Sequence, residues 1–203
     1  SKDDFHIFEN LIDKDLLESL QKECDQICKD SLKNKGQLKG RVCARGALTQ
    51  NLGYLSEKFK PYAKEFIADN VKLEISYYQI SKSTLDLEDV PGGHFHVDDN
   101  KSNLKLFVYL TDVDKDSGPF VAVPRTGSFK LRGSRIRALF WEIFHKRFFL
   151  YKFLVNYNKY EKIKKSFVGL AGTHFIVDTT SLHKDTQVKK GIRKVAVVSF
   201  NRD

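Results

Sequence analysis

The stretch Pro91-Gly92-Gly93-His94-Phe95-His96-Val97-Asp98 lies between two segments rich in β-branched and aromatic residues. In an extended conformation alternate side chains share one face, so His96 and Asp98 would point the same way. A neutral imidazole beside a carboxylate suits Fe(II), Mn(II) or Zn(II). Two protein ligands leave a metal site incomplete, and we therefore expect a third ligand from elsewhere in the chain.

His183 is the best candidate for that third ligand, because it follows a predicted strand that would bring it to the rim of a barrel. Two histidines and one carboxylate leave three octahedral positions open for O2 and a bidentate co-substrate, as in the facial triad of non-haem iron oxygenases. Arg193 follows ten residues later. Its planar guanidinium can hold a carboxylate through two hydrogen bonds, as the far end of 2-oxoglutarate requires.

Other polar residues near the motif compete for these roles. His94 shares a strand face with His96 and would become a ligand in a shifted register, although a place at the substrate entrance or a structural role fits it better. Asp99 points to the opposite face and is expected in a solvated turn. His174 lies inside a predicted strand and is expected to be a hydrogen-bonded core histidine. Tyr78, in the strand before the motif, is expected to contact the co-substrate.

The remaining chain predicts short strands preceded by helices. Asp13 should cap a first helix, and residues 52–68 should form a second, with Pro61 inside it. Gly- and Asp-rich breaks separate the predicted strands, as in a sandwich or barrel. The predicted strands are residues 72–81, 104–111, 119–123, 173–177 and 194–200.

A basic segment interrupts the strand pattern. Residues 130–165 contain eleven Lys and Arg and two Glu, so this segment carries the whole formal charge of +9. Apolar residues recur there at three- and four-residue intervals, which predicts a helical insertion over 134–155. The arginines Arg132, Arg135 and Arg137 would attract an anionic substrate, while Trp141 and its neighbours equally suit a membrane surface; a solvated basic face is the plain alternative.

Taken together, the motifs resemble a known family. The ordered set is His-x-Asp, Leu110-Thr111-Asp112-Val113, Gly118-Pro119-Phe120, Asp178-Thr179, the distal His183 and Arg193. This set is similar to the phytanoyl-CoA dioxygenase-like (PhyH-type) branch of the Fe(II)/2-oxoglutarate-dependent oxygenases, over residues 72–200. Two places depart from that pattern. Pro124-Arg125-Thr126-Gly127-Ser128 stands where Pro-Gly-Ser-His or similar is usual, and Asp185 stands where a small residue is usual. Asp185 should therefore turn outward or pair with a cation.

The resemblance implies a mainly β fold, a double-stranded β-helix (jelly roll, cupin-like) with flanking helices. It implies one oxygenase domain over 1–203, with helical support at 1–70, the jelly-roll core at 71–128 and 166–203, and the basic insertion at 129–165. His96, Asp98 and His183 map onto the iron ligands, and Arg193 onto the contact with the 2-oxoglutarate carboxylate.

The implied activity is hydroxylation of a C–H bond in a small substrate, anionic or linked to a glycan or lipid, with Fe(II), 2-oxoglutarate and O2. Asp98 argues against halogenation, which needs that coordination position for a halide. A non-catalytic jelly-roll module that binds a metal or ligand is the alternative from another class. Nucleic-acid demethylation ranks lower, because Arg193 and Arg202 lie too far apart for the paired-arginine pattern of that group.

Composition favours a globular protein in a reducing compartment. Apolar residues make up 41% and charged residues 30% of the 203 residues. The three cysteines are an odd number without metal-site spacing, and Cys24 and Cys28 read as small buried residues on a helix. The polar start at Ser1 lacks the apolar region of a signal peptide. These features predict a cytoplasmic location, with peripheral membrane contact through residues 129–165 left open.

Overall fold

The computed structural model describes residues 4–31, 41–45, 49–67, 71–82, 93, 95–98, 103–127 and 157–202. Within them, a six-stranded antiparallel sheet has the order β1-β7-β4-β9-β3-β2 and a three-stranded antiparallel sheet has the order β6-β5-β8. The strands are β1 (Phe5–Ile7), β2 (Arg41–Arg45), β3 (Val71–Lys82), β4 (Asn103–Tyr109), β5 (Phe120–Ala122), β6 (Lys165–Phe167), β7 (His174–Asp178), β8 (His183–Lys184) and β9 (Ile192–Arg202).

Both faces of the larger sheet are buried, which explains its long apolar strands. On β9, Ala196, Val198 and Phe200 pack in a cluster with residues of the helices. Val195 and Val197 point the other way, into a cluster that also holds β5 and β6 residues of the smaller sheet. Because side chains alternate along a strand, one strand supplies both cores.

Helix α1 (Lys14–Ser31) begins where the sequence predicts. The Asp13 carboxylate accepts hydrogen bonds from the backbone amides of Asp15 and Leu16, at 3.0 and 3.2 Å. These bonds satisfy amides that have no partner within the helix. Cys24 and Cys28 are fully buried one turn apart, as expected for small apolar residues.

Helix α2 (Gln50–Ile67) contains Pro61 and is capped by the Thr49 hydroxyl, which accepts a hydrogen bond from the Leu52 amide at 3.2 Å. Tyr62 lies on the outer side of this helix and is 43% exposed. The buried apolar residues of this helix are Leu52, Leu55, Phe59 and Ala63.

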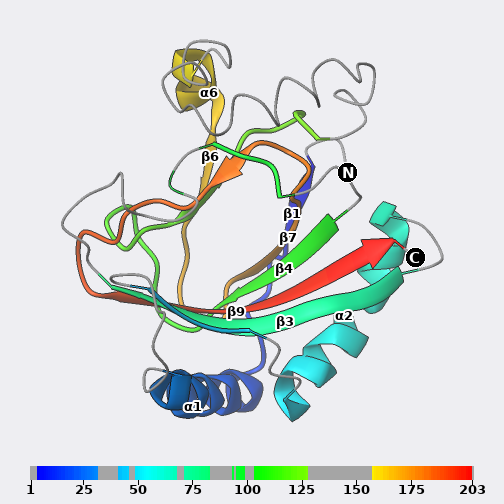
Figure 1. Ribbon diagram of the computed structural model, residues 1–203, viewed down its shortest axis with the longest axis vertical. Coiled ribbons are helices and arrows are strands. Elements are labelled where there is room, and N and C mark those ends of the chain that lie inside the picture. The colour runs from blue at the N-terminus through cyan, green and yellow to red at the C-terminus, as the bar shows by residue number, and fades with distance from the viewer. Residues whose placement is uncertain are drawn as a thin grey trace.

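The two helices cover one face of the larger sheet, and the smaller sheet lies over the other face (Figure 1). The predicted jelly roll with flanking helices is therefore confirmed, and so are the five strands predicted from the sequence. Residues 1–70 also supply the edge strands β1 and β2, beyond the expected helical support.

The expected helical insertion over 134–155 lies outside the described residues, as do Trp141 and the arginines Arg132, Arg135 and Arg137. The described end of the basic segment forms α6 (Tyr157–Ile163) and leads into β6. No helix in the described parts of the chain is both long and apolar enough to cross a membrane.

Candidate metal centre

A direct cross-strand pair brings the two candidate histidines together. The amide of His96 donates to the carbonyl of His183 at 2.9 Å, and the amide of His183 donates to the carbonyl of His96 at 2.9 Å. In such a hydrogen-bonded antiparallel pair the two side chains leave the same face of the sheet. The two imidazole rings accordingly lie 4.4 Å apart between their centroids.

Asp98 joins this pair from the same strand face, two residues after His96. Its Oδ1 lies 3.7 Å from His96 Nε2 and 3.5 Å from His183 Nε2. One possible ligand atom from each of the three residues lies within 4.8 Å of the others. The structure thus brings together three side chains that the sequence separates by as much as 87 positions.

The His183 ring is held in one orientation. Its Nδ1 lies 2.8 Å from the Ser181 carbonyl oxygen, a group that can only accept, so Nδ1 carries the proton. The other ring nitrogen, Nε2, lies on the side facing Asp98. Phe120 stacks on the same ring, with centroids 5.4 Å apart, and His183 is 3% exposed. A fixed tautomer and ring plane are what a metal ligand needs.

Lys105 holds the second oxygen of the Asp98 carboxylate. Its Nζ lies 2.6 Å from Asp98 Oδ2, and the Lys105 side chain is 16% exposed. Burial disfavours the charged carboxylate, but the His183 and His96 rings and the Lys105 ammonium outweigh it and hold the pKa of Asp98 well below its ordinary range. The carboxylate is therefore ionised near neutral pH, with Oδ1 left toward the two imidazoles.

Sequence reasoning missed Lys105, although a signal was present. It is the one charged residue in the apolar stretch 104–110, and it is spaced two and four residues from Phe107 and Tyr109. Those two residues pack between the sheets, so strand alternation places Lys105 there as well.

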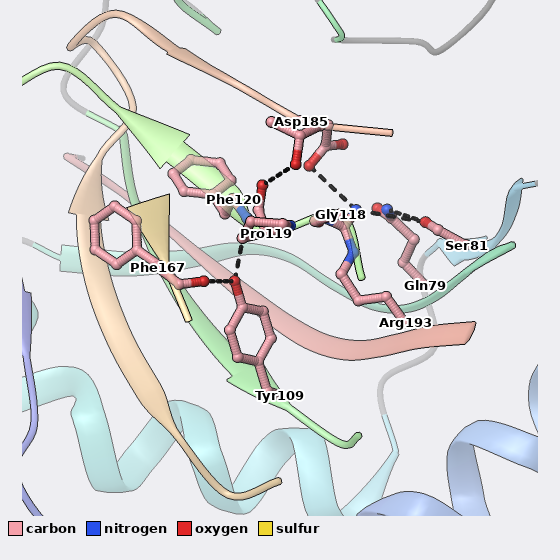
Figure 2. A network of polar contacts seen from close by, with 10 residues as sticks. Gln79, Ser81, Tyr109, Gly118, Pro119, Phe120, Phe167, Asp185 and Arg193 are labelled. Carbon is pink, nitrogen blue, oxygen red and sulfur yellow. Dashed lines mark hydrogen bonds and ion pairs between the residues drawn. The ribbon is translucent and has the colours of Figure 1, made fainter. Parts of the chain in front are cut away.

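Arg193 lies at the start of β9 on the face turned toward the smaller sheet, and its side chain is 5% exposed. Its Nη1 donates to the carbonyl of Gly118, and its Nη2 lies 3.4 Å from Ser81 Oγ and 3.2 Å from Asp185 Oδ1 (Figure 2). The Gln79 amide donates to Ser81 Oγ at 3.0 Å. Asp185 therefore pairs with a cation, one of the two arrangements expected of it, and that cation is Arg193.

Gly118 has to be glycine for this contact to form. Its φ is +73°, in the left-handed region, and a Cβ there would lie 2.7 Å from Val188 Cγ2 and 2.8 Å from the Thr186 carbonyl oxygen. The Gly118-Pro119-Phe120 motif thus lets the backbone approach the segment after β8 closely enough for a carbonyl to reach Arg193.

Tyr109 anchors the same motif from β4. Its hydroxyl donates to the Phe167 carbonyl at 2.8 Å and accepts from the Phe120 amide at 3.2 Å (Figure 2). Burial raises the pKa of Tyr109 to about 12, so the phenol remains a neutral donor. This contact holds the backbone at Phe120, whose ring packs on His183.

Tyr78 does not belong to this site. It is fully buried in the cluster facing the helices, and its hydroxyl donates to the Glu23 carboxylate of α1. On the other face of β3, Ser81 contacts Arg193, and the Gln79 amide donates to Ser81. The expected contact between Tyr78 and the co-substrate does not fit this placement, and the tyrosine instead joins α1 to the sheet.

His174 packs against Phe8 and Phe59, apart from the metal centre. His174 is 6% exposed, its Nδ1 lies 3.1 Å from the Gly172 carbonyl oxygen, and its ring stacks on Phe8, as expected for a core histidine. Burial holds the pKa of His174 below its ordinary value. His94 and Asp99 lie outside the described residues.

The residues present fit a divalent metal ion. Two neutral imidazole nitrogens and one carboxylate oxygen form the donor set of a facial triad, and the donors converge before any ion is added. Arg193 also fits a ligand with an acceptor group, because its Nε is buried without a hydrogen-bond partner among the described residues. A buried N–H without a partner is unusual and indicates a missing acceptor.

No protein-family model and no curated protein matches the sequence. Solved structures do match its fold. Iron-bound EctD from S. alaskensis is 14% identical with a TM-score of 0.65, over 99% of this chain and 73% of EctD. HygX from Streptomyces hygroscopicus, crystallised with nickel and 2-oxoglutarate, is 14% identical with a TM-score of 0.65, over 99% of this chain and 84% of HygX. SnoN, a non-haem α-ketoglutarate-dependent epimerase from nogalamycin biosynthesis, is 12% identical with a TM-score of 0.68, over 99% of this chain and 77% of SnoN. At these identities the likeness shows a shared fold.

Proposed function

We propose that this chain is an Fe(II)- and 2-oxoglutarate-dependent oxygenase that hydroxylates a C–H bond of a small substrate, in or near the PhyH-type branch. The observation that carries the proposal is the convergence of His96, Asp98 and His183, one ligand atom from each within 4.8 Å of the others. The solved structures of this fold that hold iron, or nickel with 2-oxoglutarate, support it.

Fe(II) would be held by His96 Nε2, His183 Nε2 and Asp98 Oδ1. When bound, the ion supplies open coordination positions where a 2-oxo acid and O2 meet, so that decarboxylation of the acid is coupled to oxidation of the substrate. The chain's own part is to keep Asp98 ionised, to fix the tautomer of His183 and to hold Asp98 Oδ2 on Lys105. Lys105 thereby leaves a single carboxylate oxygen for the ion.

Arg193 would bind the far carboxylate of 2-oxoglutarate. Its charge is fixed between the sheets by Gly118 and Ser81, and its Nε–H is available for an acceptor. The Arg193 side chain is 5% exposed, so little water reaches its guanidinium, and this strengthens a charged hydrogen bond.

Hydroxylation is the part of the proposal that rests on the triad alone. The epimerase among the structures of this fold depends on the same oxo acid but has another outcome. Asp98 completes a three-ligand set, which leaves no place for a halide in its position. The substrate is proposed to be anionic because residues 130–165 carry a net charge of +9, and the lipid-surface alternative rests on the same segment.

Anaerobic titration tests the proposal directly. Protein loaded with Fe(II) should gain a weak visible absorption band when 2-oxoglutarate is added, and in air it should release succinate in a metal-dependent way. His183→Ala should lose the band and the succinate, while His6→Ala, which changes an exposed histidine, should keep both. Iron binding without any effect of 2-oxoglutarate would leave a metal-binding module and contradict the enzyme.

A further inference from the structure

The environment of Arg193 contains one carboxylate already. Asp185 Oδ1 lies 3.2 Å from Arg193 Nη2, and the two side chains are 16% and 5% exposed. Asp185 comes two residues after His183 and directly after β8, so the strand that presents a metal ligand also presents this carboxylate. Figure 2 shows the Asp185 carboxylate directed at the guanidinium from the side opposite Ser81.

The charge of Arg193 is therefore neutralised within the protein. Among the described residues its other two contacts, the Gly118 carbonyl and the Ser81 hydroxyl, are uncharged. Only Nε is buried without a partner. Within the described residues, Arg193 thus offers an incoming group one unused hydrogen-bond donor, while its charge already faces the Asp185 carboxylate.

We propose that Asp185 sets the co-substrate preference of this site by competing for Arg193 with the far carboxylate of a 2-oxo acid. This inference rests on the proposed function. A 2-oxo acid with a charged far end must bring a second carboxylate to the guanidinium that Asp185 already holds. A 2-oxo acid of the same length with an uncharged far end meets no such repulsion.

The physical reason is the small exposure of the pair. Like charges that share one partly buried site repel each other strongly, because little water is present to screen them. At an effective dielectric constant near 20, one extra negative charge about 6 Å away weakens the binding of an anion by roughly 100-fold. The Nε–H offsets part of this, so we expect an effect of roughly 10- to 100-fold on the dissociation constant.

Isothermal titration of the Ni(II)-loaded protein tests the inference, because nickel keeps turnover out of the measurement. The two ligands are 2-oxoglutarate and 2-oxopentanoate, which has the same chain length but ends in a methyl group. The proteins are wild type, Asp185→Asn, which keeps an amide oxygen as acceptor and removes the charge, and Asp185→Ser. Asp116→Asn is the matched control, an aspartate on the neighbouring loop that pairs with Lys189 at 3.6 Å.

We expect Asp185→Asn to bind 2-oxoglutarate roughly 10- to 100-fold more tightly than wild type and to bind 2-oxopentanoate equally well. Asp116→Asn should match wild type for both ligands. Asp185→Ser takes the place of Asp185→Asn if the latter does not fold. Its melting temperature, compared with that of wild type, shows whether it is folded, and it should tighten 2-oxoglutarate binding in the same way.

Weaker binding of 2-oxoglutarate by Asp185→Asn would overturn the inference, because Asp185 would then be a support that positions Arg193. Equal tightening for both ligands would also overturn it, since the effect would not act on the far carboxylate. Binding of neither oxo acid by any variant would overturn the proposed co-substrate together with the inference. If wild type and Asp185→Asn instead bind 2-oxoglutarate equally tightly, the inference about Asp185 is overturned while the proposed co-substrate stands.

Discussion

Metal binding should stabilise this protein by an amount that His183→Ala removes. The three ligand atoms already lie within 4.8 Å of one another in the folded chain. In the unfolded chain, His96 and His183 are 87 positions apart in the sequence and are not held together. An ion therefore binds the folded state preferentially. Binding to the folded state alone stabilises it by RT ln(1 + [L]/Kd).

The size of the shift follows from that relation. With free metal at about 100 times its Kd, the folded state gains about 2.7 kcal/mol. For a chain of this length, about 1 kcal/mol corresponds to roughly 2–4 °C in Tm. Saturating Ni(II) or Fe(II) should therefore raise the melting temperature by about 5–11 °C.

The assay is thermal unfolding with and without metal, followed by circular dichroism under anaerobic conditions. His183→Ala is expected to melt lower than wild type without metal, because Phe120 loses its stacking partner. The quantity to compare is therefore the shift on adding metal, which should fall to near zero in His183→Ala. His6→Ala should keep the full shift. A shift of equal size in wild type and His183→Ala would refute the reasoning, because the metal would then bind elsewhere.

Three further outcomes are expected. Tyr78→Phe should lower the free energy of unfolding by about 1–2 kcal/mol in urea denaturation, because the Glu23 carboxylate loses a buried donor, and should leave 2-oxoglutarate affinity unchanged; a weaker affinity would return Tyr78 to the site. Phe175→Ala should cost about 3–5 kcal/mol in the same measurement, since this fully buried ring lies 4.4 Å from Phe167; a cost below 1 kcal/mol would contradict the packing. Glu161→Gln should lower the free energy of unfolding by about 1 kcal/mol at neutral pH, because it removes an ion pair with Lys184. Burial raises the pKa of Glu161, but its lysine partners outweigh burial and hold this pKa below its ordinary value. A group with a lowered pKa in the folded state stabilises it above the unfolded-state pKa, so the difference between Glu161→Gln and wild type should shrink as the pH falls below the ordinary glutamate range; a difference constant with pH would contradict the ion pair.

Both N-terminal helices and five of the described strands, namely β3, β4, β5, β7 and β9, could be predicted from the sequence because their signals are local. Asp13 caps α1 through hydrogen bonds that span three residues. The alternation that places His96 and Asp98 on one face also needs only neighbouring residues. His183 could be named because it follows a predicted strand, and Arg193, ten residues later, because its guanidinium suits a carboxylate. Each resembles a surface residue when taken alone, and the ordered set of motifs supported both.

Only the tertiary structure decided which strand face each residue occupies. On β3 both faces are buried, one under the helices and one against the smaller sheet. Burial of Tyr78, Gln79 and Ser81 therefore does not tell which of them face the site. Register with β9 pairs Ser81 with Arg193 and Tyr78 with Ala196, and that pairing turns Tyr78 toward α1. A one-residue shift of register would have reversed the assignment.

The sequence by itself determined a set of chemical groups, namely two imidazoles, a carboxylate and a guanidinium in a β-rich chain. The tertiary structure decided their partners: Lys105 on Asp98, Asp185 on Arg193, and His183 opposite His96. The physical reason is that a charge or a metal ligand acts over a few ångströms, and distances of that size between distant residues are fixed by strand pairing rather than by spacing along the chain.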